Sequence, residues 1–81
     1  MDIDRLRTAN FVVGLKQTLR AIEEGKTDMV FVARDADDRV RVPVVALCRQ
    51  KQLTISFVDT TETLGKACGI DVGAAVAAII S

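Results

Sequence analysis

Apolar residues recur along the chain at two spacings, one typical of helices and one typical of strands. Leu15, Leu19 and Ile22 follow the helical spacing, and Gly25 supplies the stop of that helix. The run Met29–Ala33 (MVFVA) is apolar throughout and bounded by polar residues, as expected of a strand buried on both faces. The predicted elements, in chain order, are a short helix over Met1–Thr8, an extended stretch Phe11–Val13, a helix Leu15–Glu24, a strand Met29–Ala33, a helix from Pro43 to about Lys51, a strand Thr54–Val58, a short helix between Asp59 and Gly69 and a strand Ala74–Ile80.

Individual residues set two of these boundaries. Pro43 fits the first turn of a helix, where its missing N–H costs nothing. Asp59, with Glu62 three residues later, resembles a capping box at the start of the next helix. Because strands alternate with helices and 81 residues suffice for one core, we predict a single domain over residues 1–81. Its expected fold class is α/β, a three-layer α/β/α sandwich around a small mixed four-stranded sheet.

The charge balance leaves little room for a large basic surface. Lys plus Arg and Asp plus Glu number 11 each, and the pI of about 6.1 is lower than that of most nucleic-acid-binding domains, so any anion site must be local. Two cysteines without histidine form neither a disulfide framework nor a zinc pattern. The N-terminus lacks the apolar core of a signal peptide, and the longest apolar run is too short to span a bilayer. These features predict a soluble, cytoplasmic protein.

Residues for catalysis are scarce. The chain has no His, Tyr or Trp, and the G-x-K-x-T stretch lacks the rest of a phosphate-binding P-loop. The acidic cluster Asp35, Asp37 and Asp38 could hold a magnesium ion, but a solvated loop with a helix N-cap is the favoured interpretation. Cys48 and Cys68 are interpreted as small packing residues rather than reactive thiols. We therefore expect no enzymatic activity, no metal and no cofactor.

The stretch GLKQTLR, Gly14 to Arg20, has a charge order that is unfavourable for an isolated helix. Lys16 and Arg20 lie in its first two turns, and Glu23 and Glu24 close it, the reverse of what the helix dipole prefers. A bound anion would reverse this, since it would meet free N–H groups and two cations at a start that Gly14 leaves unobstructed. Alternatively, two cations on an exposed helix carry no meaning, and the charges alone do not decide.

The stretch LGKACG, Leu64 to Gly69, carries two glycines four residues apart. In a helical turn Gly65 and Gly69 fall on one side, where another backbone or a ligand can approach closely. Leu64 lies beside this smooth surface, and Lys66 supplies a cation. The alternative is structural: the glycines end a short helix that packs tightly against the sheet. Both interpretations remain open at this point.

Together, GLKQTLRAIEEGK and LGKACGIDVGAAVAAII closely resemble the kink-turn-binding family of ribosomal proteins L7Ae and L30e. The likeness runs from about Leu6 to Ile80 and is greatest to the short bacterial, ribosomal-protein-like members. The family's fold is an α/β/α sandwich, in agreement with the pattern of elements. Kink-turns are duplexes bent sharply by a short bulge beside sheared G·A pairs, and distorted elements of this kind are what proteins can read in RNA.

The resemblance implies a non-catalytic protein that recognises and stabilises kink-turns. Lys16 would donate to guanine O6 and N7 or to a phosphate, Gln17 would contact base edges, and Arg20 would brace the backbone. Leu64 to Gly69 resembles the loop that covers the bulged nucleotide, with apolar contact from the Leu64 region and close approach at Gly65. The implied RNA-binding residues are Gly14, Lys16, Gln17, Thr18, Arg20, Leu64, Gly65, Lys66, Ala67, Cys68 and Gly69.

The implied partner is structured RNA containing kink-turns, either ribosomal RNA or a riboswitch, with the ribosome as a further candidate. The protein is expected to be a monomer and not to associate with a membrane. The alternative function is a protein-interaction or ribosome-assembly module that keeps this fold and uses another face, such as the acidic ARDADD loop.

Overall fold

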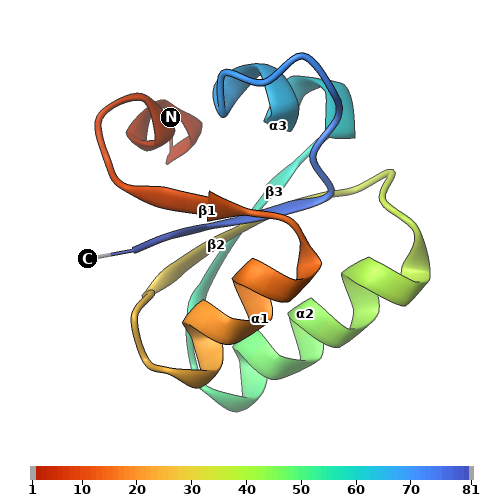
Figure 1. Cartoon of the computed structure of the whole chain (residues 1–81). Coiled ribbons are helices and arrows are strands. Elements are labelled where there is room, and N and C mark those ends of the chain that lie inside the picture. Colours follow the sequence, from red (N-terminus) through yellow and green to blue (C-terminus); the bar gives the residue numbers. More distant parts are fainter. Residues whose placement is uncertain (1, 81) are drawn as a thin grey trace.

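The computed structural model describes residues 2–80 and forms a mixed four-stranded sheet covered by helices on both faces (Figure 1). The elements, in chain order, are the 3₁₀ helix η1 (Asp2–Arg7), β1 (Phe11–Val13), α1 (Leu15–Glu23), β2 (Met29–Ala33), α2 (Asp38–Gln50), β3 (Thr54–Val58), α3 (Thr61–Ala67) and β4 (Val76–Ile79). The strand order is β1-β4-β2-β3, with β4 antiparallel to both neighbours and β2 parallel to β3. The predicted α/β sandwich is confirmed; Met1, which the first predicted helix included, lies outside the described residues.

The central strand β2 divides the core into two layers. Val30 and Val32 pack on the α1/α2 face with Val44 and Cys48, whereas Phe31 packs on the opposite face with η1 and α3. All five residues of β2 are buried, which confirms the prediction of a strand covered on both sides. Figure 1 shows α1 and α2 below the sheet and η1 and α3 above it. No helix within residues 2–80 is long and apolar enough to cross a membrane.

The predicted start of α2 at Pro43 is wrong by more than one turn. Asp37 is the N-cap, and its Oδ1 accepts a hydrogen bond from the backbone N–H of Arg39 at 2.8 Å. An aspartate cap satisfies an otherwise unpaired N–H, so the helix begins at the acidic cluster rather than at the proline. Pro43 then lies inside the helix, where it cannot donate to the carbonyl of Arg39.

The predicted cap of α3 is wrong by one residue. Thr60, in an extended conformation (φ −137°, ψ 155°), is the N-cap, and its hydroxyl accepts from the N–H of Thr63 at 3.0 Å. A second acceptor comes from far along the chain, since Asp35 Oδ1 receives the N–H of Thr61 at 2.7 Å. Asp59 instead stays exposed near Arg34, with their charged atoms 3.7 Å apart.

All three α-helices begin at the same edge of the sheet, the one formed by the carboxyl ends of β1, β2 and β3. The strands β1, β2 and β3 end there and β4 begins there, as the pairing of Val13 with Ala77 and the bond from Ala33 N–H to the Ala75 carbonyl (2.8 Å) require. Each of these three strands is followed by an α-helix, so three positive helix ends point toward this edge. The starts of α2 and α3 are already completed by Asp37, Thr60 and Asp35, which leaves the start of α1 as the one without a side-chain acceptor.

Candidate functional site

The start of α1 is open. Gly14 is the N-cap, with φ of 99°, and no side chain caps the helix there. Its N–H donates to the carbonyl of Val76 at 3.0 Å, and its own carbonyl accepts from the N–H of Thr18 at 2.9 Å. A Cβ at this position would meet nothing within 4 Å, so the positive φ rather than crowding requires glycine. The leading N–H groups of α1 consequently have no side-chain acceptor, in contrast to those of α2 and α3.

Two side chains of the predicted set flank this open start. Lys16 and Gln17 are both exposed, and the first turn of α1 contains no acidic residue. Arg20 is also exposed but lies in the last turn, where a cation complements the dipole. The unfavourable charge at the start of this helix is therefore that of Lys16 alone, which corrects the prediction that Arg20 shares in it.

Thr18, by contrast, faces the interior. Its side chain has no exposed surface, and its Oγ1 has no hydrogen-bond partner within the described chain. The structure therefore does not place the Thr18 side chain among the exposed, groove-facing residues with which the resemblance grouped it. An unpaired buried hydroxyl is unfavourable by about 1–3 kcal/mol.

The second predicted segment is packed rather than open. Leu64 has no exposed surface and Cys68 is 9% exposed, and both belong to the core cluster below η1 and α3. Gly65 is buried as well, and a Cβ there would lie 2.2 Å from the carbonyl oxygen of Val72. The Leu64 side chain itself is therefore not at the surface, and the backbone that approaches Gly65 closely is that of the chain's own loop at Val72.

The remaining residues of that segment surround this packed centre. Ala67 is partly buried against the same core, and Gly69 ends the helix region at φ 76°. Lys66 is exposed, with its Nζ 3.1 Å from Glu62 Oε1. Of the six residues from 64 to 69, the structure thus leaves Lys66 and Gly69 exposed to a ligand.

Val72, which the sequence analysis did not select, is the apolar side chain that this region exposes. It is 70% exposed, more than any other large apolar residue described as exposed. It belongs to a loop that is fixed to α3 by hydrogen bonds from Ile70 N–H to the Gly65 carbonyl (3.1 Å) and from Ala74 N–H to the Thr61 carbonyl (3.0 Å). The available signal was an isolated valine between an aspartate and a glycine, in a stretch with neither helical nor strand periodicity.

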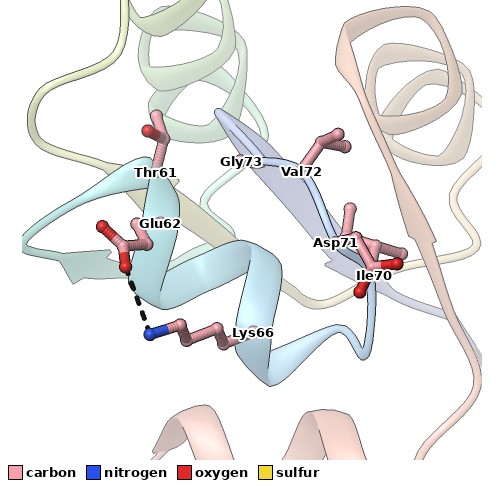
Figure 2. Close-up of a pocket in the computed structure, with 7 residues that line it drawn as sticks. All are labelled: Thr61, Glu62, Lys66, Ile70, Asp71, Val72 and Gly73. Atoms are coloured by element: carbon pink, nitrogen blue, oxygen red, sulfur yellow. Dashed lines mark ion pairs between the residues drawn. The ribbon is translucent and has the colours of Figure 1, made fainter.

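A cavity of about 400 Å³ lies between this loop and α3. Figure 2 shows the ion-paired side chains of Glu62 and Lys66 on the helix side and the loop opposite them, with the Val72 side chain directed away from the helix. The lining residues are Thr61, Glu62, Lys66, Ile70, Asp71, Val72 and Gly73. This hollow is thus lined by the cation of Lys66, the carboxylates of Glu62 and Asp71 and apolar surface.

The structure brings the two segments together through β4. The loop 70–75 leads directly into Val76, whose carbonyl accepts the N–H of Gly14. The open start of α1 and the loop that carries Val72 therefore lie at the same edge of the sheet, although they are far apart in sequence (Figure 1).

The acidic cluster caps helices rather than forming a metal site. Asp35 accepts from Thr61 N–H, Asp37 from Arg39 N–H, and Asp38 pairs with Arg41. The hydrogen bonds from Arg39 hold the pKa of Asp37 below its usual value. No group of three or more His, Cys, Asp or Glu residues that could hold a metal ion occurs within residues 2–80.

Both cysteines are buried and unpaired. Burial raises the pKa of the Cys48 and Cys68 thiols above the usual value, so both stay protonated at neutral pH. Since the thiolate is the reactive form, this environment agrees with packing residues.

Comparison with known proteins gives a consistent set of relatives. A model of the ribosomal protein L7Ae/L30e/S12e/Gadd45 family matches residues 3–81. An RNA-binding protein of Halalkalibacterium halodurans is 47% identical over 73 residues, which cover 90% of this chain and 89% of that protein. The RNA-binding protein YbxF of Geobacillus stearothermophilus is 43% identical over 75 residues, covering 93% and 92%. The solved structure of the Giardia lamblia 15.5kD RNA binding protein matches with a TM-score of 0.84 at 26% identity, covering 98% of this chain and 68% of that one.

Proposed function

Because the chain belongs to the ribosomal protein L7Ae/L30e/S12e/Gadd45 family, we propose that it is a non-catalytic RNA-binding protein that recognises and stabilises kink-turns. Its relatives are named for RNA binding rather than for a reaction. The natural partners of such a protein are ribosomal RNA or a riboswitch that contains this bend.

The observation that carries the proposal is the difference among the three helix starts. The starts of α2 and α3 are capped by the side chains of Asp37 and Thr60, and each has an acidic residue in its first turn. The start of α1 has neither, and it presents exposed Lys16 and Gln17 beside Gly14. Open N–H groups, a positive dipole end and a cation form a site for an RNA phosphate or base edge.

The side chains at this start favour base contacts in an opened groove. Lys16 donates to guanine O6 and N7, and Gln17 can both donate to and accept from base edges. Ordinary A-form RNA has a deep, narrow major groove that side chains cannot enter, whereas a kink at sheared G·A pairs exposes these edges. A helix start of this kind therefore distinguishes a kink-turn from a straight duplex.

The second contact is the loop that carries Val72. A kink-turn contains an unpaired bulge nucleotide, and its base needs apolar surface once it leaves the stack. We assign that surface to Val72 and the neighbouring hollow, with Lys66 close enough to attract a phosphate. In this proposal the residues from 64 to 69 hold the Val72 loop in place through their packing, and Lys66 is the one among them that contacts the RNA with a charged group.

The test is a titration with two labelled RNAs of equal length and charge, one a kink-turn and the other a straight duplex. We expect at least a hundredfold tighter binding to the kink-turn, with an affinity that falls as the salt concentration rises. Lys16→Ala should weaken binding and flatten the salt dependence, whereas the matched control Lys51→Ala, an exposed lysine at the end of α2, should do neither.

Two outcomes would contradict the proposal. Equal affinity for both RNAs would identify a nonspecific binder, for which the geometry of the helix start is irrelevant. Absence of binding to either RNA at low salt would favour the alternative, a protein-interaction or ribosome-assembly module built on the same fold.

A further inference from the structure

A second feature is the unpaired lateral edge of the sheet, formed by β3, which lies beside a groove. β3 is the terminal strand of the sheet and pairs only with β2 among the described strands. Beside it, a groove of about 330 Å³ runs between this strand and the outer face of α2. The groove is lined by Arg41, Val42, Val45, Ala46, Arg49 and Phe57.

The backbone of β3 has unused hydrogen-bonding groups along this edge. Thr54 N–H donates to the Asp28 carbonyl at 3.1 Å, and the Val58 carbonyl accepts from Arg34 N–H at 2.7 Å, so both ends of the strand direct these groups toward β2. In a strand the two sides alternate residue by residue, and in a parallel pair the N–H and C=O of one residue face the same side. The N–H and C=O groups of Ile55 and Phe57 therefore point outward, where another strand can pair with them.

The groove next to these groups is apolar at its centre. Val42 is 55% exposed and Phe57 is 38% exposed, and these are two of the three large apolar residues described as exposed. The third, Val72, belongs to the proposed RNA site, and the other two, Val42 and Phe57, both line this groove. A strand added beside β3 would direct every second side chain to the α2 side, over this apolar surface.

Arginines surround the apolar centre. The guanidinium carbon of Arg34 lies 5.1 Å from the centroid of the Phe57 ring, and Arg41 and Arg49 line the groove from α2. Arg34 and Arg41 already contact Asp59 and Asp38. Arg49 has no ion pair within residues 2–80, so the rim has an excess of positive charge that an acidic side chain would neutralise.

We propose that this edge and groove bind an extended segment of a partner protein, with apolar residues at alternate positions and acidic residues beside them, as an added strand next to β3. A second copy of the chain fits less well, since two copies joined edge to edge would bring the same arginines together. An RNA strand would leave the outward N–H and C=O pairs of Ile55 and Phe57 without the regular partner that a peptide backbone supplies. The surface is distinct from the start of α1, so it allows a protein and an RNA to bind together.

The test is selection of a displayed library of random twelve-residue peptides against the full chain. We expect enriched sequences with alternating apolar residues and an excess of acidic ones. A synthetic peptide of the enriched sequence should shift the NMR signals of the Ile55 and Phe57 amides. Its affinity should fall at least threefold with Arg49→Glu or Val42→Asp, both exposed positions, and more than tenfold when proline replaces a central peptide residue, because proline cannot donate to the strand.

The matched control is Lys16→Glu, which alters the other site and should leave peptide affinity unchanged. The proposal is overturned if no sequence is enriched, if the enriched sequences are basic, or if Arg49→Glu and Val42→Asp bind the peptide as the unaltered chain does. It is also overturned if the peptide shifts amides at the start of α1 instead of those of β3. None of these results depends on whether the chain binds a kink-turn.

Discussion

Gly14 and Gly65 belong to the two segments that the sequence singled out, and the structure requires glycine at each for a different reason. At Gly14 the backbone has φ of 99° and a Cβ would meet nothing within 4 Å. At Gly65 the backbone is helical, and a Cβ would lie 2.2 Å from the Val72 carbonyl oxygen. The first glycine leaves a helix start open, and the second allows a loop to pack closely on a helix.

This difference separates a binding role from a supporting role. Around Gly14 the N–H groups of α1 have no side-chain cap, and Lys16 and Gln17 are exposed, so an external partner can complete the helix start. Around Gly65 the chain already supplies the partners, since the 70–74 backbone bonds to α3 and Thr60 caps it. Changes in the first segment should therefore affect binding with little effect on stability, and changes in the second should affect stability first.

The largest effect is expected for Gly65→Val. The new side chain would occupy the space of the Val72 carbonyl, so α3 and the loop must separate, and overpacking of this severity lowers the free energy of unfolding by about 3 kcal/mol or more. Urea unfolding measures this change. Lys66→Val introduces the same β-branched residue at the adjacent exposed position and should cost less than about 1 kcal/mol. A stable Gly65→Val variant that has lost RNA binding would show that this glycine serves the approach of a ligand.

The second effect concerns binding alone. Gln17→Ala should weaken kink-turn affinity by about 1–3 kcal/mol through lost base-edge contacts, with the melting temperature unchanged because the side chain is exposed. Fluorescence titration and thermal unfolding of the same sample measure both quantities. Gln50→Ala, an exposed glutamine at the end of α2, is the matched control and should leave affinity unaltered. Equal affinities of all three proteins would contradict the assignment of the site to the α1 start.

The third prediction removes the side-chain cap of α3, so that this helix start resembles the uncapped start of α1. Thr60→Ala removes the hydroxyl that accepts the N–H of Thr63, and loss of an N-cap of this type lowers the free energy of unfolding by about 1 kcal/mol. Amide exchange at Thr63 should accelerate. Thr60→Ser keeps the hydroxyl oxygen, so its free energy of unfolding and its Thr63 exchange rate should stay close to those of the unaltered chain. If Thr60→Ala has no effect, Asp35 alone completes the start of α3 through its bond to Thr61 N–H.

Sequence pattern predicted the layers of this fold because long apolar repeats identify buried elements. Met29–Ala33 and the helix after Gly14 were placed nearly as observed, and the α/β/α sandwich follows from their alternation. The starts of α2 and α3 were misplaced because several residues compete for each cap. Pro43 suits a first helical turn and Asp59 suits a cap, but neither begins its helix. The cap at Asp37 lies within the acidic cluster where an N-cap was favoured, whereas the choice of Thr60 over its neighbour Asp59 depends on backbone conformation that no pattern records.

The site could be predicted only where its chemistry is polar and local. The charge pattern singled out Lys16, because a cation at a helix start is unusual, whereas Gln17 was implied only by the family resemblance. Leu64 and Val72 are both apolar, and no local property distinguishes the buried one from the exposed one. Leu64 is buried in the core cluster, whereas Val72 lies on a loop whose backbone packs against Gly65. Both environments are tertiary, so neither the pattern nor the family motif around Leu64 indicated that Val72 is exposed.

The smallest effect on stability is expected for Lys16→Glu, in which stability and RNA affinity should change in opposite directions. A carboxylate in the first turn of α1 complements the helix dipole, so the free protein should become more stable by about 0.3–1 kcal/mol. The same carboxylate would repel an RNA phosphate, so kink-turn affinity should fall. Lys51→Glu makes the identical charge change beyond the C-terminus of α2, where it should lower stability by a similar amount and leave RNA affinity unaffected.

Salt provides the check on this pair of variants. Both stability changes should shrink as the ionic strength rises, because they are interactions of exposed charges with helix ends. The opposite signs exclude a general preference of the protein for one net charge, since each variant alters the net charge equally. If Lys16→Glu destabilises the free protein and leaves RNA binding unchanged, the start of α1 is a solvated helix end like any other, and the exposed lysine beside Gly14 does not indicate a ligand.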